Sequence, residues 1–193
     1  MYYLPVSGLP MIEEDEAAGE IADLYEETKR TLDMPFVPNL AKAMAFSLPM
    51  ARVPLALYGA FFQNISLPQT LIAMISYCIP TAKNCHYCAA NGELHCRSLG
   101  IDEEILEKLA KDLDSVNPKR VRAIIKFALK CALDPQSLMA EDYDQVRDQG
   151  VSDEELLEII MIAAVANFSD TLADALKIEV DAPIAQALAL HNS

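Results

Sequence analysis

The sequence predicts an all-α protein that forms a single domain over residues 1–193. Apolar residues recur at the three- to four-residue spacing of amphipathic helices along most of the chain. No segment alternates apolar and polar residues as a half-buried strand does, and no internal repeat is present. The chain is 52% hydrophobic and has no Pro-, Gly- or Ser-rich linker, so it is long enough to bury one sizeable core.

The first predicted helix covers residues 16–33, where Ile21, Leu24 and Tyr25 share one face. Pro35 ends this helix because proline cannot donate a helical hydrogen bond. The next predicted helices cover residues 40–46, 52–63 and 69–78, the last of them stopping near Pro80.

A helix over residues 84–99 is predicted next, with Asn84 as its N-cap and Gly100 as its stop. Two further helices follow at residues 103–113, capped by Asp102, and 118–132. The 152–177 segment opens on Ser152-Asp153-Glu154-Glu155, which has the spacing of a capping box. Its apolar face is too wide for a lone surface helix, so we expect this helix in the core or at an interface.

Charge and composition exclude several functions. The net charge of −14 and the scattered arrangement of the 15 basic residues argue against nucleic-acid binding, which needs clustered Lys and Arg. Met1–Pro5 carries no basic stretch ahead of an apolar one, and the run from Ile159 to Phe168 is shorter than the roughly 18 residues of a membrane span. We therefore expect a soluble, cytoplasmic protein that binds neither nucleic acid nor membrane.

The CxxC pair in Asn84-Cys85-His86-Tyr87-Cys88 is the main functional signal. If Asn84 caps the helix, Cys85 occupies the first turn, where free N–H groups and the helix dipole stabilise a thiolate. Cys88 is three residues further along the same face, so the two sulfurs can meet. The pattern favours thiol redox chemistry, and its alternatives are two packed apolar residues or half of a zinc site.

A zinc site needs two further ligands at suitable spacing, and the chain has no second CxxC. We therefore predict no metal and no other cofactor. His95 is seven residues after Cys88, on the same face but about 10 Å along the helix axis. It is a candidate for proton transfer if it comes within hydrogen-bond reach. Cys78 and Cys131 have apolar surroundings typical of core packing, and the odd count of five cysteines argues against a disulfide framework.

Over about residues 10–180 the chain resembles the carboxymuconolactone decarboxylase superfamily, in particular its alkylhydroperoxidase D-like, peroxidase-related branch. The resemblance rests on an acidic N-terminal helix followed by Phe36-Val37-Pro38-Asn39-Leu40, the CxxC segment, and Ala166-Asn167-Phe168 in a buried helix. It implies a helical bundle with the CxxC at the N-terminus of a core helix. It also implies a homo-oligomer, since family members assemble as dimers, trimers or hexamers, and we expect an assembly based on a dimer, up to a hexamer.

The resemblance implies a thiol-dependent peroxidase or disulfide oxidoreductase of antioxidant defence. Its substrate would be an organic peroxide or hydrogen peroxide, and its reductant a thiol or lipoyl group. In the family the second cysteine, here Cys88, generally attacks the peroxide and the first, Cys85, resolves it. The dipole argument favours Cys85 instead, so the sequence leaves the nucleophile open.

The family's glutamate and histidine relay falls here on Ala73 and Gly92. No Asp or Glu lies between Asp33 and Glu93, so we expect weakened peroxide turnover, which histidine at position 92 would improve. Two alternatives remain: a catalytically silent redox sensor or oligomeric scaffold of the same fold, and a lactone decarboxylase-like enzyme.

Overall fold

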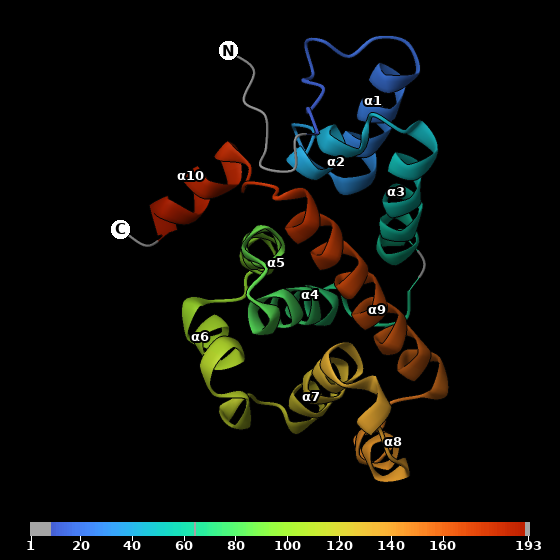
Figure 1. Ribbon diagram of the computed structural model, residues 1–193. Helices are drawn as coiled ribbons and strands as arrows, with labels where there is room; N and C mark the ends of the chain where they lie inside the picture. The colour runs from blue at the N-terminus through green and yellow to red at the C-terminus, as the bar shows by residue number, and fades with distance from the viewer. Residues whose placement is uncertain (1–8, 64, 192–193) are drawn as a thin grey trace.

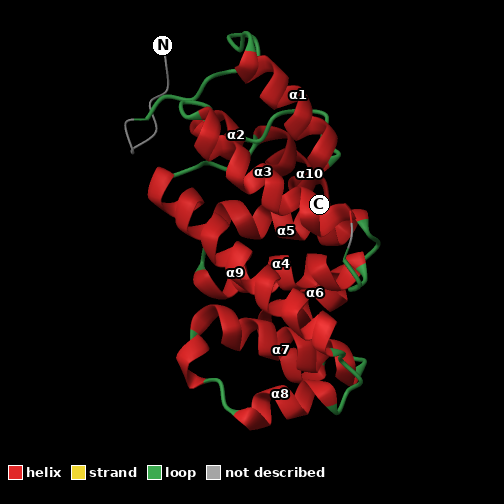
Figure 2. Ribbon diagram, turned by 90° about the vertical axis from the view of Figure 1, so that its right-hand side faces the viewer, coloured by secondary structure: helices red, strands yellow, loops and turns green. Residues whose placement is uncertain are grey.

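The computed structural model describes residues 9–63 and 65–191, and every regular element in these residues is a helix (Figures 1 and 2). The predicted all-α class is therefore confirmed for this part of the chain, whereas Met1–Pro5 lies outside it. The elements in order are α1 (Glu20–Leu32), α2 (Asn39–Met44), α3 (Leu48–Gln63), α4 (Gln69–Lys83), α5 (His86–Ser98), α6 (Glu103–Lys111), α7 (Lys119–Leu133), α8 (Ala140–Arg147), α9 (Asp153–Leu176) and α10 (Ala182–His191), with short 3₁₀ turns at Leu113–Ser115 and Pro135–Ser137.

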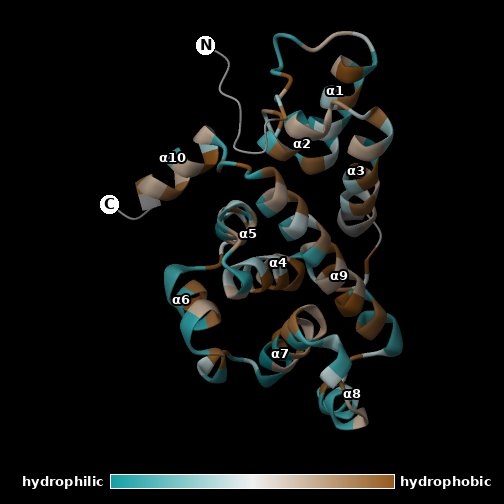
Figure 3. Ribbon diagram, in the orientation of Figure 1, coloured by the Kyte–Doolittle hydropathy of each residue, from teal (hydrophilic) through white to brown (hydrophobic). Residues whose placement is uncertain are grey.

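The main hydrophobic core lies where α4, α7 and α9 pack together. Ile75 and Ile79 of α4, Ile124 and Ile125 of α7, and Ile159 of α9 are fully buried there. Each such side chain contributes about 1.5–3 kcal/mol relative to an exposed one. The hydrophobic faces of these helices turn toward one another, and α6 and α8 cover the outside with polar faces (Figure 3).

Helix α9 is the central helix that its wide apolar face predicts. Its capping box is confirmed, because Ser152 Oγ accepts from the Glu155 N–H at 3.1 Å while Glu155 Oε2 accepts from the Ser152 N–H at 2.8 Å. Within the described residues, α9 alone is long and apolar enough to cross a membrane by length and composition. The apolar residues of α9 are buried against α4 and α7 in the helical core.

The corner between α4 and α5 differs from the sequence prediction in two ways. Helix α4 does not stop near Pro80 but continues to Lys83 with Pro80 buried inside it. Asn84 is not the N-cap of the next helix: it adopts the left-handed conformation, with φ of 60°, and ends α4. Asparagine tolerates this conformation better than most residues, and the Cys85 N–H closes the turn on the Pro80 carbonyl at 2.9 Å.

Several helix boundaries also shift from those predicted. Helix α3 begins at Leu48 and contains Pro54, although the sequence places its start four residues later. Helices α8 and α10 lie outside all predicted elements. Both are short, eight and ten residues, and their hydrophobic periodicity is correspondingly hard to read.

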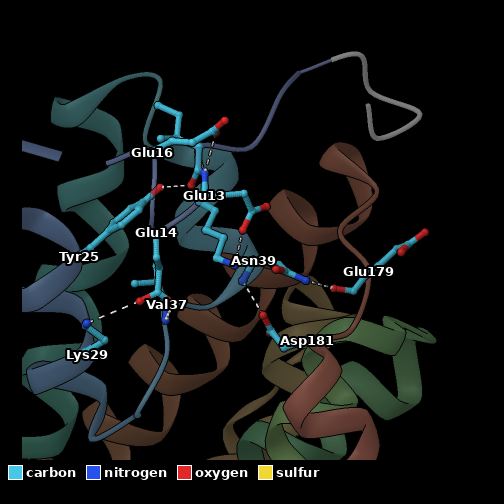
Figure 4. A network of polar contacts seen from close by, with 11 residues as sticks. Glu13, Glu14, Glu16, Tyr25, Lys29, Val37, Asn39, Glu179 and Asp181 are labelled. Atoms are coloured by element: carbon cyan, nitrogen blue, oxygen red, sulfur yellow. Dashed lines mark hydrogen bonds and ion pairs between the residues drawn. The ribbon is translucent and has the colours of Figure 1, made fainter. Parts of the chain in front are cut away.

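A polar network joins the N-terminal helices to the segment that precedes α10 (Figure 4). The buried Asp181 carboxylate accepts a hydrogen bond from the Asn39 N–H at 2.7 Å, and the Asn39 side chain donates to the Glu179 carbonyl at 3.1 Å. On the other side of α2, Glu14 accepts from the Val37 N–H at 2.9 Å. These contacts fix the layer of α1, α2 and α3 that covers the functional site.

Candidate functional site

Two sulfurs and one carboxylate meet between α5 and α9. One ligand atom from each of Cys85, Cys88 and Asp170 lies within 4.8 Å of the other two. Cys85 is fully buried, Cys88 is partly buried, and Asp170 is only 1% exposed. The sequence brings the two cysteines together by their spacing, and the fold adds an acid that lies 82 positions further along the chain.

The helix start shifts by one residue relative to the prediction, and this changes the roles of the cysteines. Helix α5 begins at His86, so Cys85 is its N-cap residue and Cys88 is the third residue of its first turn. The Cys85 side chain makes no capping hydrogen bond. The favourable position beside free helix N–H groups therefore belongs to Cys88 rather than to Cys85.

A cavity of about 520 Å³ lies next to Cys88. Cys88 and Asp170 both line it, whereas Cys85 is not part of its wall. Most of the lining is apolar, contributed by Leu32, Met34, Pro35, Phe36, Leu40, Met44, Leu55, Ile72, Ile162, Val165 and Ile184, among others. A molecule in this cavity meets the Cys88 sulfur first, with Cys85 behind it.

Lys83 holds the Asp170 carboxylate from the end of α4. Its ammonium nitrogen lies 3.2 Å from Asp170 Oδ2 and donates a 2.6 Å hydrogen bond to Asn167 Oδ1. The Asn167 amide in turn donates to the Ala132 carbonyl at 2.7 Å. Even so, neither Asp170 oxygen accepts a hydrogen bond of good geometry from the described residues. A buried carboxylate in this state has unused capacity to accept a proton or to bind a cation.

The electrostatics of the site disfavour extra negative charge. The pKa of Cys88 is raised, first because its thiol hydrogen-bonds to Cys85, then because it is buried and because Asp170 adds negative charge nearby. Burial also raises the pKa of the Asp170 carboxyl, and the charge of Lys83 opposes that shift. The raised pKa makes the Asp170 carboxylate a stronger base than an ordinary aspartate, and this favours its acceptance of a proton from sulfur, whereas the raised pKa of Cys88 opposes loss of that proton.

Tyr58 and Ser169 form a second polar pair on the cavity wall. Their hydroxyl oxygens are 2.7 Å apart, and Ser169 donates its proton to the Val165 carbonyl at 2.8 Å. Tyr58 therefore donates to Ser169, because a serine hydroxyl has one proton. Burial raises the pKa of Tyr58 to about 12, so its phenol stays neutral at physiological pH.

His95 lies on the wall of the same cavity, and burial lowers its pKa, which favours the neutral imidazole. Ala73 and Gly92, the two positions of the missing relay, are both tightly packed against neighbouring residues. Ala73 is fully buried in the main core, and Gly92 packs against the backbone of α4 at Ser76 and Tyr77. A Cβ at position 92 would stand 2.7 Å from the Ser76 carbonyl oxygen, so the expected benefit of histidine there is wrong on steric grounds.

Asp170 and Lys83 were not predicted from the sequence as site residues. A signal for Asp170 does exist: it lies eleven residues after Ile159, three helical turns along the buried face of α9. A charged residue on a face that is otherwise apolar indicates a partnered or functional group, because burying a lone charge is costly. No comparable signal marks Lys83, which the sequence presents as an ordinary lysine at a helix end.

Solved structures with the same architecture define the class of fold. The chain is similar to the alkylhydroperoxidase AhpD core of a peroxidase-related protein from Ralstonia eutropha, with a TM-score of 0.80 and 22% identity over 91% of this chain and 92% of that one. It is equally similar to a peroxidase-related protein from a Silicibacter species, with a TM-score of 0.81 and 22% identity over 94% of each chain. The debrominase Bmp8 is a further neighbour, with a TM-score of 0.79 and 18% identity over 95% of this chain and 97% of that one.

The chain thus has the alkylhydroperoxidase D-like fold, and the resemblance seen in the sequence is confirmed at the level of the fold. A Cys-to-Ala variant of the debrominase has also been solved in complex with 2,3,4-tribromopyrrole. No protein-family model and no curated protein sequence matches the chain.

Proposed function

We propose that this protein is a thiol-dependent peroxidase that cycles Cys85 and Cys88 between dithiol and disulfide. One observation carries the proposal: the two sulfurs meet a buried carboxylate, with Cys88 on the cavity wall and Cys85 behind it. The AhpD-like fold of the peroxidase-related neighbours supports it. Asp170 takes the place of the missing relay, from a helix that lies after the CxxC in the chain.

In the first step Asp170 accepts the proton of the Cys88 thiol, and the thiolate attacks the outer oxygen of a hydroperoxide. The O–O bond breaks, Cys88 becomes a sulfenic acid, and the alkoxide takes a proton to leave as the alcohol. Lys83 keeps the carboxylate in place at 3.2 Å, and the protonated Asp170 gives its proton to the alkoxide, which restores the carboxylate. This arrangement supplies the general-base function that Ala73 and Gly92 cannot provide.

In the second step the Cys85 thiol attacks the Cys88 sulfenic sulfur, which forms the disulfide and releases water. The burial of Cys85 protects it from peroxide until this step. An external dithiol, of the small-thiol or lipoyl class, then reduces the disulfide by thiol exchange and is itself oxidised to a disulfide. Access to the exchange runs through Cys88, because it is the cysteine on the cavity wall.

The test is consumption of cumene hydroperoxide and of hydrogen peroxide with dithiothreitol or dihydrolipoamide as reductant. We expect many turnovers by the wild type, none by Cys88→Ser, and at most one by Cys85→Ser, which should leave a sulfenic acid on Cys88 that dimedone traps. Cys131→Ser, which removes a partly buried thiol elsewhere, is the matched control and should retain full activity. A single disulfide-forming event without turnover would support the redox-sensor alternative instead.

Reductive dehalogenation is a second candidate, favoured by the large apolar cavity beside Cys88 and by the debrominase neighbour. The Cys88 thiolate would take the halogen from a bromoarene, the arene would gain a proton, and Cys85 would displace bromide to form the same disulfide. Bromide release from 2,3,4-tribromopyrrole, measured under the same reducing conditions, separates the two candidates. If bromide is released while peroxide is not consumed, the peroxidase proposal is wrong.

A further inference from the structure

We propose that the reduced site binds one zinc ion through the sulfurs of Cys85 and Cys88 and the carboxylate of Asp170. The three donor atoms come from two helices and already lie within 4.8 Å of one another. Zinc holds thiolate sulfur at about 2.3 Å and carboxylate oxygen at about 2.0–2.2 Å, so small side-chain rotations bring all three donors onto one ion. The sequence offers only the two cysteines, and the fold supplies the third ligand.

The unpartnered Oδ1 of the buried Asp170 carboxylate is the second observation that points to a ligand. The side chain is 1% exposed; the Lys83 ammonium lies 3.2 Å from Oδ2 as an ion pair, whereas Oδ1 has no hydrogen-bond donor among the described residues. A buried acceptor of this kind is destabilising if nothing satisfies it. A cation between the carboxylate and the two sulfurs satisfies it directly.

Charge balance also favours a divalent cation at this place. Lys83 lies 3.2 Å from Asp170 Oδ2, so the site already contains one positive charge. When both thiols lose their protons on metal binding, two thiolates and one carboxylate balance the divalent ion and the Lys83 ammonium. A buried site with no net charge avoids the large desolvation cost of an uncompensated ion.

The surroundings orient the carboxylate as metal sites require. Lys83 contacts Oδ2 and is itself fixed by Asn167, whose amide is held by the Ala132 carbonyl. Such outer contacts keep a ligand aimed at its metal and raise affinity by about 10–100-fold in known sites. Thiolate-rich donor sets select zinc, cadmium or copper(I) over magnesium or calcium.

The cavity completes the coordination. Cys88 and Asp170 line it, so a tetrahedral ion has three protein ligands and one position facing the cavity for water or a small molecule. Zinc bound here occupies the same two sulfurs that must form the disulfide. Metal binding and cysteine oxidation therefore exclude each other, and zinc acts as a reversible inhibitor of any redox cycle at the site.

The test measures metal binding directly and does not depend on the proposed peroxidase activity. Reduced protein is titrated with Zn²⁺ against a chromophoric chelator, and with Cd²⁺ and Co²⁺, whose thiolate charge-transfer and visible bands report sulfur ligation. We expect one ion per chain in the wild type and in Cys131→Ser, and loss of the bands in Cys85→Ser and Cys88→Ser. In Asp170→Asn we expect affinity to fall at least tenfold, whereas Asp174→Asn, an exposed carboxylate one turn further along α9, should bind as the wild type does.

The inference is overturned if Cys85→Ser and Cys88→Ser keep the metal, if Cys131→Ser loses it, or if Asp170→Asn binds as tightly as the wild type. Circular dichroism checks that each variant is folded. If Asp170→Asn does not fold, the wild-type chain with the Cys85–Cys88 disulfide formed provides a second test, because it keeps every side chain except the two thiols. That oxidised chain should bind no zinc, and saturating zinc should protect both cysteines of the reduced chain from peroxide.

Discussion

The carbonyl oxygen of Ser76 faces Gly92 so closely that a Cβ at position 92 would lie 2.7 Å from it and 2.8 Å from the Cα of Tyr77. In a regular helix the Ser76 carbonyl would accept the N–H four residues later, but that residue is Pro80, which has none. The proline and the glycine thus act together. They let α5 approach the backbone of α4, and this approach places Cys88 at the cavity wall.

We therefore predict that Gly92→Ala destabilises the protein by about 1–3 kcal/mol, although alanine is the better helix former. The cost arises because the backbone of α4 cannot move away as a flexible side chain can. Gly59→Ala is the matched control in α3, where the one contact of the new Cβ with the described residues is Thr31 Cγ2 at 3.4 Å, and it should be neutral or stabilise by up to about 1 kcal/mol. Urea unfolding of both variants gives the comparison; equal free energies of unfolding would contradict it.

Asp170→Asn should slow peroxide turnover by about 100-fold, since general-base assistance typically contributes 10²–10⁴-fold. Asparagine has nearly the same shape but cannot accept the Cys88 proton. Asp174→Asn, one turn further along α9 and exposed, is the control and should retain wild-type turnover. A stopped-flow measurement of sulfenic acid formation separates this step from reduction of the disulfide, and an unchanged rate of that step would exclude Asp170 as the base.

The reactivity of Cys88 should rise steadily with pH through and above neutrality, without an optimum near pH 7. Its pKa is raised because its thiol hydrogen-bonds to Cys85, because it is buried and because Asp170 is close. The fraction of thiolate is therefore small at neutral pH and grows as the pH increases. Iodoacetamide alkylation of Cys88 followed by mass spectrometry from pH 6 to 10 measures this, and a plateau reached below pH 7 would contradict the expected direction.

Self-association through the outer face of α9 is the next prediction. Leu157, Met161 and Ala164 form an exposed stripe on this helix, with Leu157 62% and Met161 43% exposed. Apolar stripes of this kind on soluble proteins usually mark interfaces. Light scattering should give a molar mass that is a multiple of the 21.2 kDa of one chain, as expected for a dimer or for an assembly of dimers. The Leu157→Glu, Met161→Glu variant should shift toward the monomer, whereas Met50→Glu on α3 should not; a wild-type monomer at micromolar concentration would rule out this interface.

The comparison of sequence and structure shows which features are local. The helical class, the capping box at Ser152 and the proximity of Cys85 to Cys88 follow from spacings of at most four residues, and these can be read directly. The role of Asn84 could not be read from the sequence. Asparagine is favoured both at a helix N-cap and at a left-handed position that ends a helix, and tertiary packing decides between these two positions. The contact of Asp170 with Cys88 joins residues 82 positions apart and depends on the packing of α5 against α9.

His95 provides a test of the cavity's burial through the pH dependence of stability. Burial lowers the pKa of His95 below the ordinary value of 6.5, so the folded protein binds fewer protons at this residue than the unfolded chain does. The contribution of His95 to stability is therefore fully present above pH 6.5 and is lost as the pH falls from there through the lowered folded pKa.

His95→Asn should flatten this part of the stability profile, because asparagine does not titrate. His86→Asn makes the same substitution at an exposed position of the same helix and serves as the matched comparison. Thermal unfolding of the three proteins between pH 5 and 8 makes the comparison, and an unchanged slope in His95→Asn would show that this imidazole is as hydrated in the folded protein as in the unfolded chain.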